Sequence, residues 1–328
     1  MLARAGFDQF ASADTAVAHA RFLRAICKVP PRPLHALIST LVRAETWLRW
    51  PLRTLNMLDG VDDTFRRIDP DGARFGLTPA LQRRFRRNLL YDGIADLAVV
   101  LGGIDKPVFR RRALSVDGQE ILENQRESGR GAIVVGFRLG VYPGIPLTLG
   151  ALGYYIGMIV GGRRLIRAAQ TLGEQFAPDA SARIQYMSAQ DPLVLARSQE
   201  QLNAGNVVCT LMELSPIKYA KTTPVKFLDW TINVAYGIPY LSAVTGRPVI
   251  PALLLGGNGW RFRLQFLEPL PAPARDRASI FAATQTMYGV LEEQVRRHPE
   301  QWAGWTILES HLGIDLGRPV PLRMPAVS

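Results

Sequence analysis

The amino-acid sequence predicts an α/β sandwich with a mixed, mostly parallel sheet, preceded by a helical N-terminal extension. From residue 116 onward, short runs of β-branched and other apolar residues alternate with longer stretches whose apolar residues recur at helical spacing. Such alternation is typical of strands joined by crossover helices. Residues 1–115 show helical spacing only. Because no repeat or long linker separates the two parts, we expect one α/β domain (116–328) with a helical extension (1–115).

Each predicted element follows from a local pattern. The run Ala132-Ile133-Val134-Val135 predicts a strand, and Pro143 opens a helix because proline is tolerated in a first turn. The predicted strands are 132–136, 154–160, 183–187, 207–211, 249–255 and 261–267. The predicted helices are 117–128, 143–152, 164–176, 191–203, 235–245 and 279–297.

The extension contains apolar helices that are rich in arginine. Residues 34–50 form one predicted helix, with Trp47 and Trp50 near its end, and 79–101 form another. Indole rings beside guanidinium groups suit the interface of an anionic membrane. Packing against the protein's own core, or a solvated face, explains the same pattern. Seven arginines lie in or just after the second helix: Arg83, Arg84, Arg86, Arg87, Arg110, Arg111 and Arg112.

The uncharged stretch from 139 to 162 is long enough for a membrane-spanning helix. We reject that interpretation because Pro143, Pro146 and several glycines would interrupt the helix. The same residues are better explained as the end of one strand, a helix and a second strand.

The composition is that of a globular protein with anionic partners. Hydrophobic residues make up 48% and charged residues 20%, which excludes a disordered or collagen-like chain. The net charge is +11, and 34 of the 39 cationic residues are arginine. Because arginine suits phosphate and carboxylate groups, we expect an anionic membrane surface or an acidic carrier protein as partner. Nucleic acid is not expected, since no nucleic-acid-binding motif accompanies the arginines.

Several common kinds of site are not indicated. There is no G-x-G-x-x-G after a strand, no P-loop and no G-x-S-x-G, so neither a nucleotide nor a nucleophile elbow is predicted. None of the four histidines lies at metal-ligand spacing from another, so no metal is expected. Cys27 and Cys209 are far apart, which suits a reducing compartment. Residues 1–16 have no apolar run of signal-peptide length, so no signal peptide is expected.

Four short motifs in the α/β part resemble those of one protein family. The motifs are Val116–Glu120 with Ser128–Gly136, then Ala204–Glu213, Tyr236–Pro251 and His298–Trp302. Together they resemble four motifs of the bacterial lauroyl/myristoyl (lipid A late) acyltransferases. The first resembles the entry to that family's catalytic strand, and the second resembles a strand that ends at an acidic residue. The third resembles a segment in which a helix ends at glycine and the next strand ends at proline, and the fourth resembles the closing Pro-Glu-Gln-Trp signature. The resemblance covers residues 110–305 in outline.

This resemblance implies a glycerolipid-acyltransferase-like α/β sandwich in a peripheral protein at the cytoplasmic face of the bacterial inner membrane. It implies no bound cofactor. An acyl thioester, on acyl carrier protein or coenzyme A, would be the co-substrate, and a lipid or another amphipathic small molecule would be the acceptor.

The sequence departs from this family at the residues that carry its chemistry. The family has a histidine and an acidic residue, with four residues between them, just after the strand at 132–136, and the imidazole takes the acceptor's proton. In one alignment Phe137 and Tyr142 occupy these two places, and in the other Arg138 and Pro143 do. Neither alignment retains a base, because Phe has no titratable group and Arg keeps its proton near pH 7.

Two residues are candidates for replacing the lost pair. Glu213 ends a predicted strand, where a carboxylate beside an apolar slot can have a raised pKa and act as a base; a cap of the following turn is the alternative. Arg138 can polarise a carbonyl or bind a phosphate, or form a surface ion pair. The candidate substrate-binding residues are Phe137, Tyr142, Arg163, Arg164, Lys218 and Lys221. Of these, the two arginines resemble a position that the family uses near its acceptor.

Three further segments with charged residues bear on the expected partners and chemistry. Lys218, Lys221 and Lys226 lie within nine residues and suit docking of an acidic carrier protein, although a solvated loop explains them as well. His311 and Asp315 are not expected to replace the lost pair, because only three residues separate them. The segment after Trp302 lacks the basic run that the family often has there, which argues against lipid A as acceptor.

The sequence therefore predicts a protein that transfers or handles an acyl chain from an acyl thioester to an amphipathic acceptor, with an amine as one option. The alternative is a catalytically inactive acyl-chain binder or partner subunit of an active acyltransferase. A third option is a membrane-surface adaptor that uses only the N-terminal helices.

Overall fold

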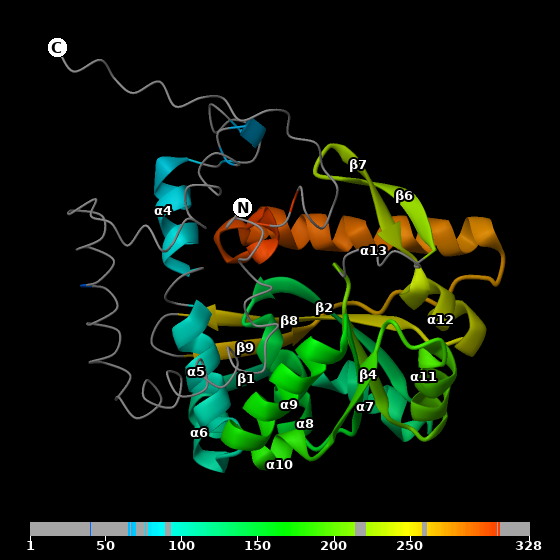
Figure 1. Ribbon diagram of the computed structural model, residues 1–328, viewed down its shortest axis with the longest axis horizontal. Coiled ribbons are helices and arrows are strands. Elements are labelled where there is room, and N and C mark those ends of the chain that lie inside the picture. Colours follow the sequence, from blue (N-terminus) through cyan, green and yellow to red (C-terminus); the bar gives the residue numbers. More distant parts are fainter. Residues whose placement is uncertain are drawn as a thin grey trace.

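The computed structural model describes residues 40, 65, 67–69, 76, 78–88, 93–213, 221–257, 261–306 and 308. One central sheet is covered by helices on both faces (Figure 1). This arrangement confirms the predicted α/β sandwich with a mixed, mostly parallel sheet.

The central sheet contains seven strands in the order β1-β9-β8-β2-β5-β3-β4. Their bounds are β1 (Leu114–Asp117), β2 (Ala132–Gly140), β3 (Ile156–Val160), β4 (Ile184–Ser188), β5 (Val207–Leu211), β8 (Val249–Gly257) and β9 (Arg261–Phe266). From β8 to β4 all neighbours are parallel, whereas β9 is antiparallel to β8 and β1 is parallel to β9. The central strands are almost continuously apolar because helices cover both of their faces.

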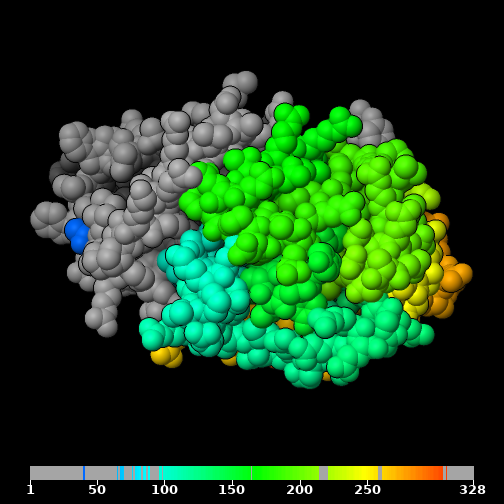
Figure 2. All heavy atoms as spheres, turned by 90° about the horizontal axis from the view of Figure 1, so that it is seen from below, coloured from blue at the N-terminus to red at the C-terminus, as the bar shows by residue number. Residues whose placement is uncertain are grey.

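Helices occupy both faces of the sheet. The described α-helices are α4 (Pro79–Arg87), α5 (Gly93–Gly103), α6 (Pro107–Ala113), α7 (Gln119–Glu127), α8 (Ile145–Ala151), α9 (Arg163–Phe176), α10 (Pro178–Ser181), α11 (Val194–Asn203), α12 (Gly237–Thr245) and α13 (Arg277–Arg297). The 3-10 turns are η5 (Tyr142–Gly144), η6 (Pro299–Gln301) and η7 (Ala303–Thr306). Helices α5 to α10 pack on one face, which Figure 2 shows with α6 to α10 in cyan to green, and α4, α11, α12 and α13 pack on the other.

The alternation of side chains along β2 builds two separate cores. Ile133 and Val135 pack into the core beneath α13, while Ala132 and Val134 pack into the core beneath α8. Phe85, from the predicted extension, packs into the same core as α13. The described part of the extension therefore shares its hydrophobic core with the α/β part.

A separate two-stranded hairpin lies over α13 (Figure 1). It consists of β6 (Thr222–Phe227) and β7 (Trp230–Ala235), which are antiparallel. Exposed and buried residues alternate strictly along β6. No strand is predicted here from the sequence, because the turn residues Leu228 and Asp229 have φ values of 48° and 67° without the glycine or asparagine that normally signals such a turn.

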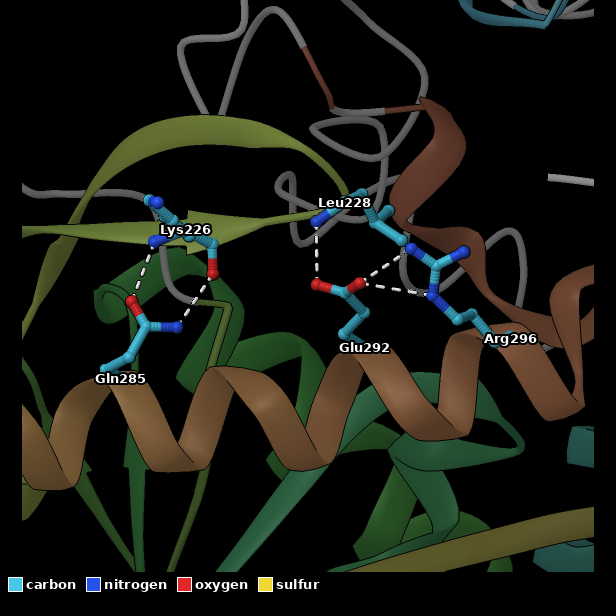
Figure 3. Close-up of polar contacts among 5 residues, drawn as sticks. All are labelled: Lys226, Leu228, Gln285, Glu292 and Arg296. Carbon is cyan, nitrogen blue, oxygen red and sulfur yellow. Dashed lines mark hydrogen bonds and ion pairs between the residues drawn. The ribbon is translucent and has the colours of Figure 1, made fainter. Parts of the chain in front are cut away.

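Polar contacts from α13 fasten the hairpin at two points (Figure 3). The Gln285 amide oxygen accepts from the Lys226 backbone N–H at 2.8 Å, and the Gln285 side-chain nitrogen donates to the Lys226 carbonyl at 2.9 Å. Two turns later, Glu292 accepts from the Leu228 backbone N–H at 2.9 Å and forms an ion pair with Arg296. These contacts fix the hairpin to two turns of α13.

All six strands predicted from the sequence are confirmed, with β2 and β8 extending beyond their predicted ends. Strand β1, which begins two residues before the predicted boundary at 116, is not predicted from the sequence. Of the helix predicted over 79–101, the structure describes α4 and α5, and residues 89–92 lie outside the described residues. The helix predicted over 34–50 lies outside them too, apart from Thr40.

The uncharged stretch from 139 to 162 forms the end of β2, then η5, α8 and β3. The predicted strand–helix–strand interpretation is therefore confirmed. Among the residues that the structure describes, no helix is both long enough and apolar enough to cross a membrane.

Candidate functional site

The candidate site lies where the two central strands β2 and β5 end. The strands are parallel and pair from Ala132–Val207 to Gly136–Leu211, so their carboxyl ends meet at one edge of the sheet. After β2 the chain continues into η5 and α8 on one face of the sheet, and after β5 the next described elements, the hairpin and α12, lie on the opposite face. Open α/β sheets bind ligands at such switch points.

A bulge in β2 determines how its last residues are placed. The register with β8 shifts between Gly136 and Gly140. Gly140 has φ +65°, and a Cβ there would lie 2.3 Å from the Leu254 carbonyl oxygen, so only glycine fits. Bulges re-aim the side chains beside them, and here Arg138 lies within the irregular segment.

Glu213 and Arg138, the two residues singled out as catalytic candidates, are in direct contact. One carboxylate oxygen of Glu213, Oε2, accepts from the Arg138 backbone N–H at 2.8 Å, and the Arg138 Nε donates to the Glu213 carbonyl at 3.4 Å. The other carboxylate oxygen, Oε1, accepts from the indole Nε1 of Trp302 at 2.7 Å. The structure thus joins the ends of β2 and β5 to a segment 89 residues further along the chain.

The surroundings of Glu213 raise its affinity for a proton. Its side chain is fully buried, and this burial raises the pKa of the carboxyl above its usual value, although the hydrogen bond from Trp302 and the charge of Arg138 act in the opposite direction. Burial likewise raises the pKa of Tyr142 and of Tyr288, and in both residues the Glu213 charge adds to the effect. The Arg138 guanidinium contacts Glu213 directly, and the Glu213 charge acts on two buried phenols.

An aromatic cluster fixes the orientation of Trp302. Its indole is fully buried and packs edge-on against Trp305, with ring centroids 4.8 Å apart, and against Phe227 of the hairpin at 5.6 Å. Its backbone forms an isolated antiparallel bridge with Leu139 of β2. The Pro-Glu-Gln-Trp signature is visible in the sequence, but no role is predicted for Trp302 from it. A tryptophan in a motif after the last predicted helix was the signal that could have pointed to this residue.

Two of the candidate substrate-binding residues, Phe137 and Tyr142, have different surroundings. Phe137 is buried in the core that also contains Trp302, and its ring has no proton to exchange. Tyr142, on η5, is buried next to the Arg138 side chain. Tyr142 therefore belongs to the polar cluster with Arg138 and Glu213, whereas Phe137 contributes apolar packing beneath it.

The remaining candidate residues lie on other segments. Arg163 is exposed at the start of α9, after β3, and Lys221 is exposed just before β6. Neither makes a hydrogen bond or ion pair with the Arg138–Glu213 pair. The side chain of Arg164, and all of Lys218, His311 and Asp315, lie outside the described residues.

The chemistry available at this site is acid–base and electrostatic. Within the described ranges of the chain, no three His, Cys, Asp or Glu side chains are grouped so that they could bind a metal ion. A carboxyl with a raised pKa can take up a proton near neutral pH, and a guanidinium can stabilise a developing oxyanion or bind a phosphate. Comparison of the chain with protein-family models and with curated protein sequences found no match.

Proposed function

We propose that this protein is a diverged relative of the lauroyl/myristoyl acyltransferases. It transfers an acyl chain from an acyl thioester to an amphipathic acceptor at the cytoplasmic face of the inner membrane. The observation that carries the proposal is the contact between Arg138 and Glu213 at the carboxyl ends of two neighbouring parallel strands. A polar pair at this switch point occupies the place where an α/β enzyme binds its substrate.

The chemistry assigns separate roles to the two residues. The nitrogen of a neutral amine acceptor attacks the thioester carbonyl, and the Arg138 guanidinium stabilises the oxyanion that forms. The carbon–sulfur bond then breaks, an amide bond remains, and the thiol leaves as thiolate. Glu213 in its ionised form takes the proton lost by the amine, for which its raised pKa gives it a higher affinity, and returns it to the thiolate. An amine suits this site because it is nucleophilic without a strong base.

The net positive charge of the chain supports the proposed acyl donor and the proposed location at the membrane. The chain has a net charge of +11, which suits both an acidic acyl carrier protein and an anionic membrane surface. Coenzyme A is an alternative donor because it presents the same thioester on a phosphorylated arm. The exposed Arg163 on α9 is available for an anionic acceptor.

A second candidate function is acyl-chain binding without catalysis, as a partner subunit of an active acyltransferase. Glu213 is fully buried, and each of its carboxylate oxygens already accepts a hydrogen bond. In this version the carboxylate serves to position the backbone of Arg138, and no proton is transferred.

Acyl-transfer assays distinguish the two candidates. The purified protein is incubated with acyl carrier and coenzyme A thioesters and with amine or alcohol acceptors, and products are followed by mass spectrometry. We expect Arg138→Gln to reduce turnover by roughly 100-fold, the effect of removing one oxyanion donor. Glu213→Gln should reduce turnover and also remove the pH dependence of kcat/KM that comes from this carboxyl. The control Glu293→Gln, on the exposed face of α13, should change neither turnover nor that pH dependence. Acyl-chain binding by native mass spectrometry, without transfer to any acceptor, would establish the second candidate instead.

A further inference from the structure

The carboxylate of Glu213 connects two separate segments through its two oxygen atoms. Oε2 accepts from the Arg138 backbone N–H at 2.8 Å, and Oε1 accepts from the Trp302 indole Nε1 at 2.7 Å. Arg138 belongs to the end of β2, whereas Trp302 follows η6. Because an ionised carboxylate only accepts hydrogen bonds, both N–H groups have a full partner as long as Glu213 carries its charge.

The Arg138 N–H depends on this carboxylate because of the bulge in β2. The register between β2 and β8 shifts between Gly136 and Gly140, and the three β2 residues between these glycines have a single residue opposite them on β8. A bulge leaves backbone groups without a partner in the strand ladder. Here the N–H of the middle residue, Arg138, donates to Glu213 and not to a neighbouring strand.

The two donors differ in how firmly their surroundings hold them. Trp302 is fully buried, and its ring packs against Trp305 and Phe227. Arg138 is only half-buried, and its Nε makes a longer hydrogen bond of 3.4 Å to the Glu213 carbonyl. A half-buried bulge residue can turn its N–H toward water, whereas the buried indole cannot. The hydrogen bond at Arg138 is therefore the one that breaks more easily.

Uptake of one proton by Glu213 removes half of this arrangement. A neutral carboxyl keeps one good acceptor oxygen, while its other oxygen becomes a hydroxyl that donates. Two N–H donors then compete for one acceptor, and the negative charge that strengthened both hydrogen bonds is lost. Because burial raises the pKa of this carboxyl, the change takes place at a higher pH than in an exposed glutamate.

The ionisable groups that act on Glu213 come from three elements. In the part of the chain that the structure describes, they are Arg138 of β2, Tyr142 of η5 and Tyr288 of α13. Arginine keeps its proton in proteins, and burial raises the pKa of both phenols, so the two tyrosines are neutral near pH 7. Glu213 is therefore the one of these four groups whose charge can change below the pH at which the phenols ionise.

We propose that Glu213 is a pH-sensitive switch that controls the position of Arg138. The ionised carboxylate fixes the bulge of β2, and uptake of one proton releases the Arg138 N–H while Trp302 stays in place. The switch itself stands on the two hydrogen bonds and the bulge. Its meaning as regulation of acyl transfer rests on the proposed function, because a released Arg138 no longer holds its guanidinium where the oxyanion forms.

The test follows the two hydrogen bonds in the wild-type protein, without any substrate. Isotope labelling of tryptophan gives an NMR signal for each indole N–H, and Trp302→Phe identifies the signal of Trp302. Hydrogen exchange measured by mass spectrometry follows the backbone N–H groups of residues 137–140. Trp305 is an internal control, because its indole N–H donates to the Pro299 carbonyl, which does not ionise.

As the pH falls from about 9 to about 5, we expect the Trp302 signal to titrate with one midpoint. At the same midpoint the exchange of residues 137–140, corrected for the intrinsic rate, should rise about tenfold. The Trp305 signal should not change. Glu213→Gln has one acceptor oxygen at every pH, so it should abolish both titrations and exchange rapidly throughout. The control Glu293→Gln, which alters only an exposed ion pair on α13, should keep both titrations.

A Trp302 signal that titrates without any change in exchange at residues 137–140, or the absence of both titrations, would overturn the switch. Titrations that persist in Glu213→Gln would belong to another group and would overturn it as well. The wild-type measurements decide the question even if Glu213→Gln does not fold. A switch in a protein that transfers no acyl chain would support this inference and refute the proposed catalysis, whereas acyl transfer without a switch would refute this inference alone.

Discussion

Replacing Trp302 with phenylalanine removes the hydrogen bond from Nε1 to the Glu213 carboxylate while leaving an aromatic ring in place. Because Glu213 is fully buried, its Oε1 would be left without a partner and without water. Leaving a buried acceptor unpaired costs about 1–3 kcal/mol, and more when the acceptor is charged. The smaller ring adds about 1 kcal/mol through lost apolar contact. We therefore expect Trp302→Phe to lower the free energy of unfolding by about 3–4 kcal/mol.

Trp305 provides a matched control. Its indole is 1% exposed, compared with 0% for Trp302, and it donates to the neutral carbonyl of Pro299 at 2.8 Å. Trp305→Phe should cost about 2 kcal/mol, because it removes a similar ring area and a hydrogen bond to an uncharged acceptor. The difference of about 1–2 kcal/mol between the two variants measures the contribution of the carboxylate.

Urea denaturation at fixed pH measures both variants, and an unchanged slope against urea confirms that only stability has changed. The double variant with Glu213→Gln completes a mutant cycle, in which the extra cost of Trp302→Phe should largely disappear. Equal costs for Trp302→Phe and Trp305→Phe, together with no coupling to Glu213, would refute the view that Trp302 stabilises the buried carboxyl.

Two further predictions concern carboxylates. Burial raises the pKa of Glu213 in the folded state, so the folded protein binds this proton more tightly than the unfolded chain does. As the pH rises from the pKa of the unfolded chain through the pKa of the folded protein, this carboxyl therefore lowers the free energy of unfolding. Glu213→Gln should abolish that loss, and urea midpoints of the variant and wild type that stay parallel from pH 4 to 9 would contradict the assignment. Glu292→Ala should lower the free energy of unfolding by about 1–2 kcal/mol, because it leaves the Leu228 backbone N–H of the hairpin unpaired. The control Glu293→Ala breaks only an exposed ion pair with Arg297 and should cost less than about 0.5 kcal/mol in the same urea assay.

The fold was largely predictable because its signal is local. Runs such as Ala132–Val135 and the helical spacing that follows them identify strands and helices without knowledge of their partners. The hairpin escaped prediction because its turn places Leu228 and Asp229 at positive φ without the usual turn residues, while Glu292 of α13 accepts from the Leu228 N–H. β1 escaped prediction because it is a four-residue edge strand whose pairing with β9 depends on a segment about 150 residues away.

The candidate site was predictable only in part. The sequence pointed to Arg138 and Glu213 separately, one from the segment after a strand and the other from the end of a strand. Since parallel strands end at the same edge, their proximity required only that β2 and β5 be neighbours, which is a property of strand order. The hydrogen bond from Trp302 could not be anticipated, because no local pattern relates residue 302 to residue 213.

The sequence by itself determined most of the strands and helices and the excess of positive charge. These follow from side-chain periodicity and residue identity, which are properties of the chain alone. Only the tertiary structure decided that Glu213 is a buried carboxyl joined to Arg138 and Trp302. Burial and long-range contact depend on strand order and packing, so the pKa of a carboxyl is fixed only when distant segments meet.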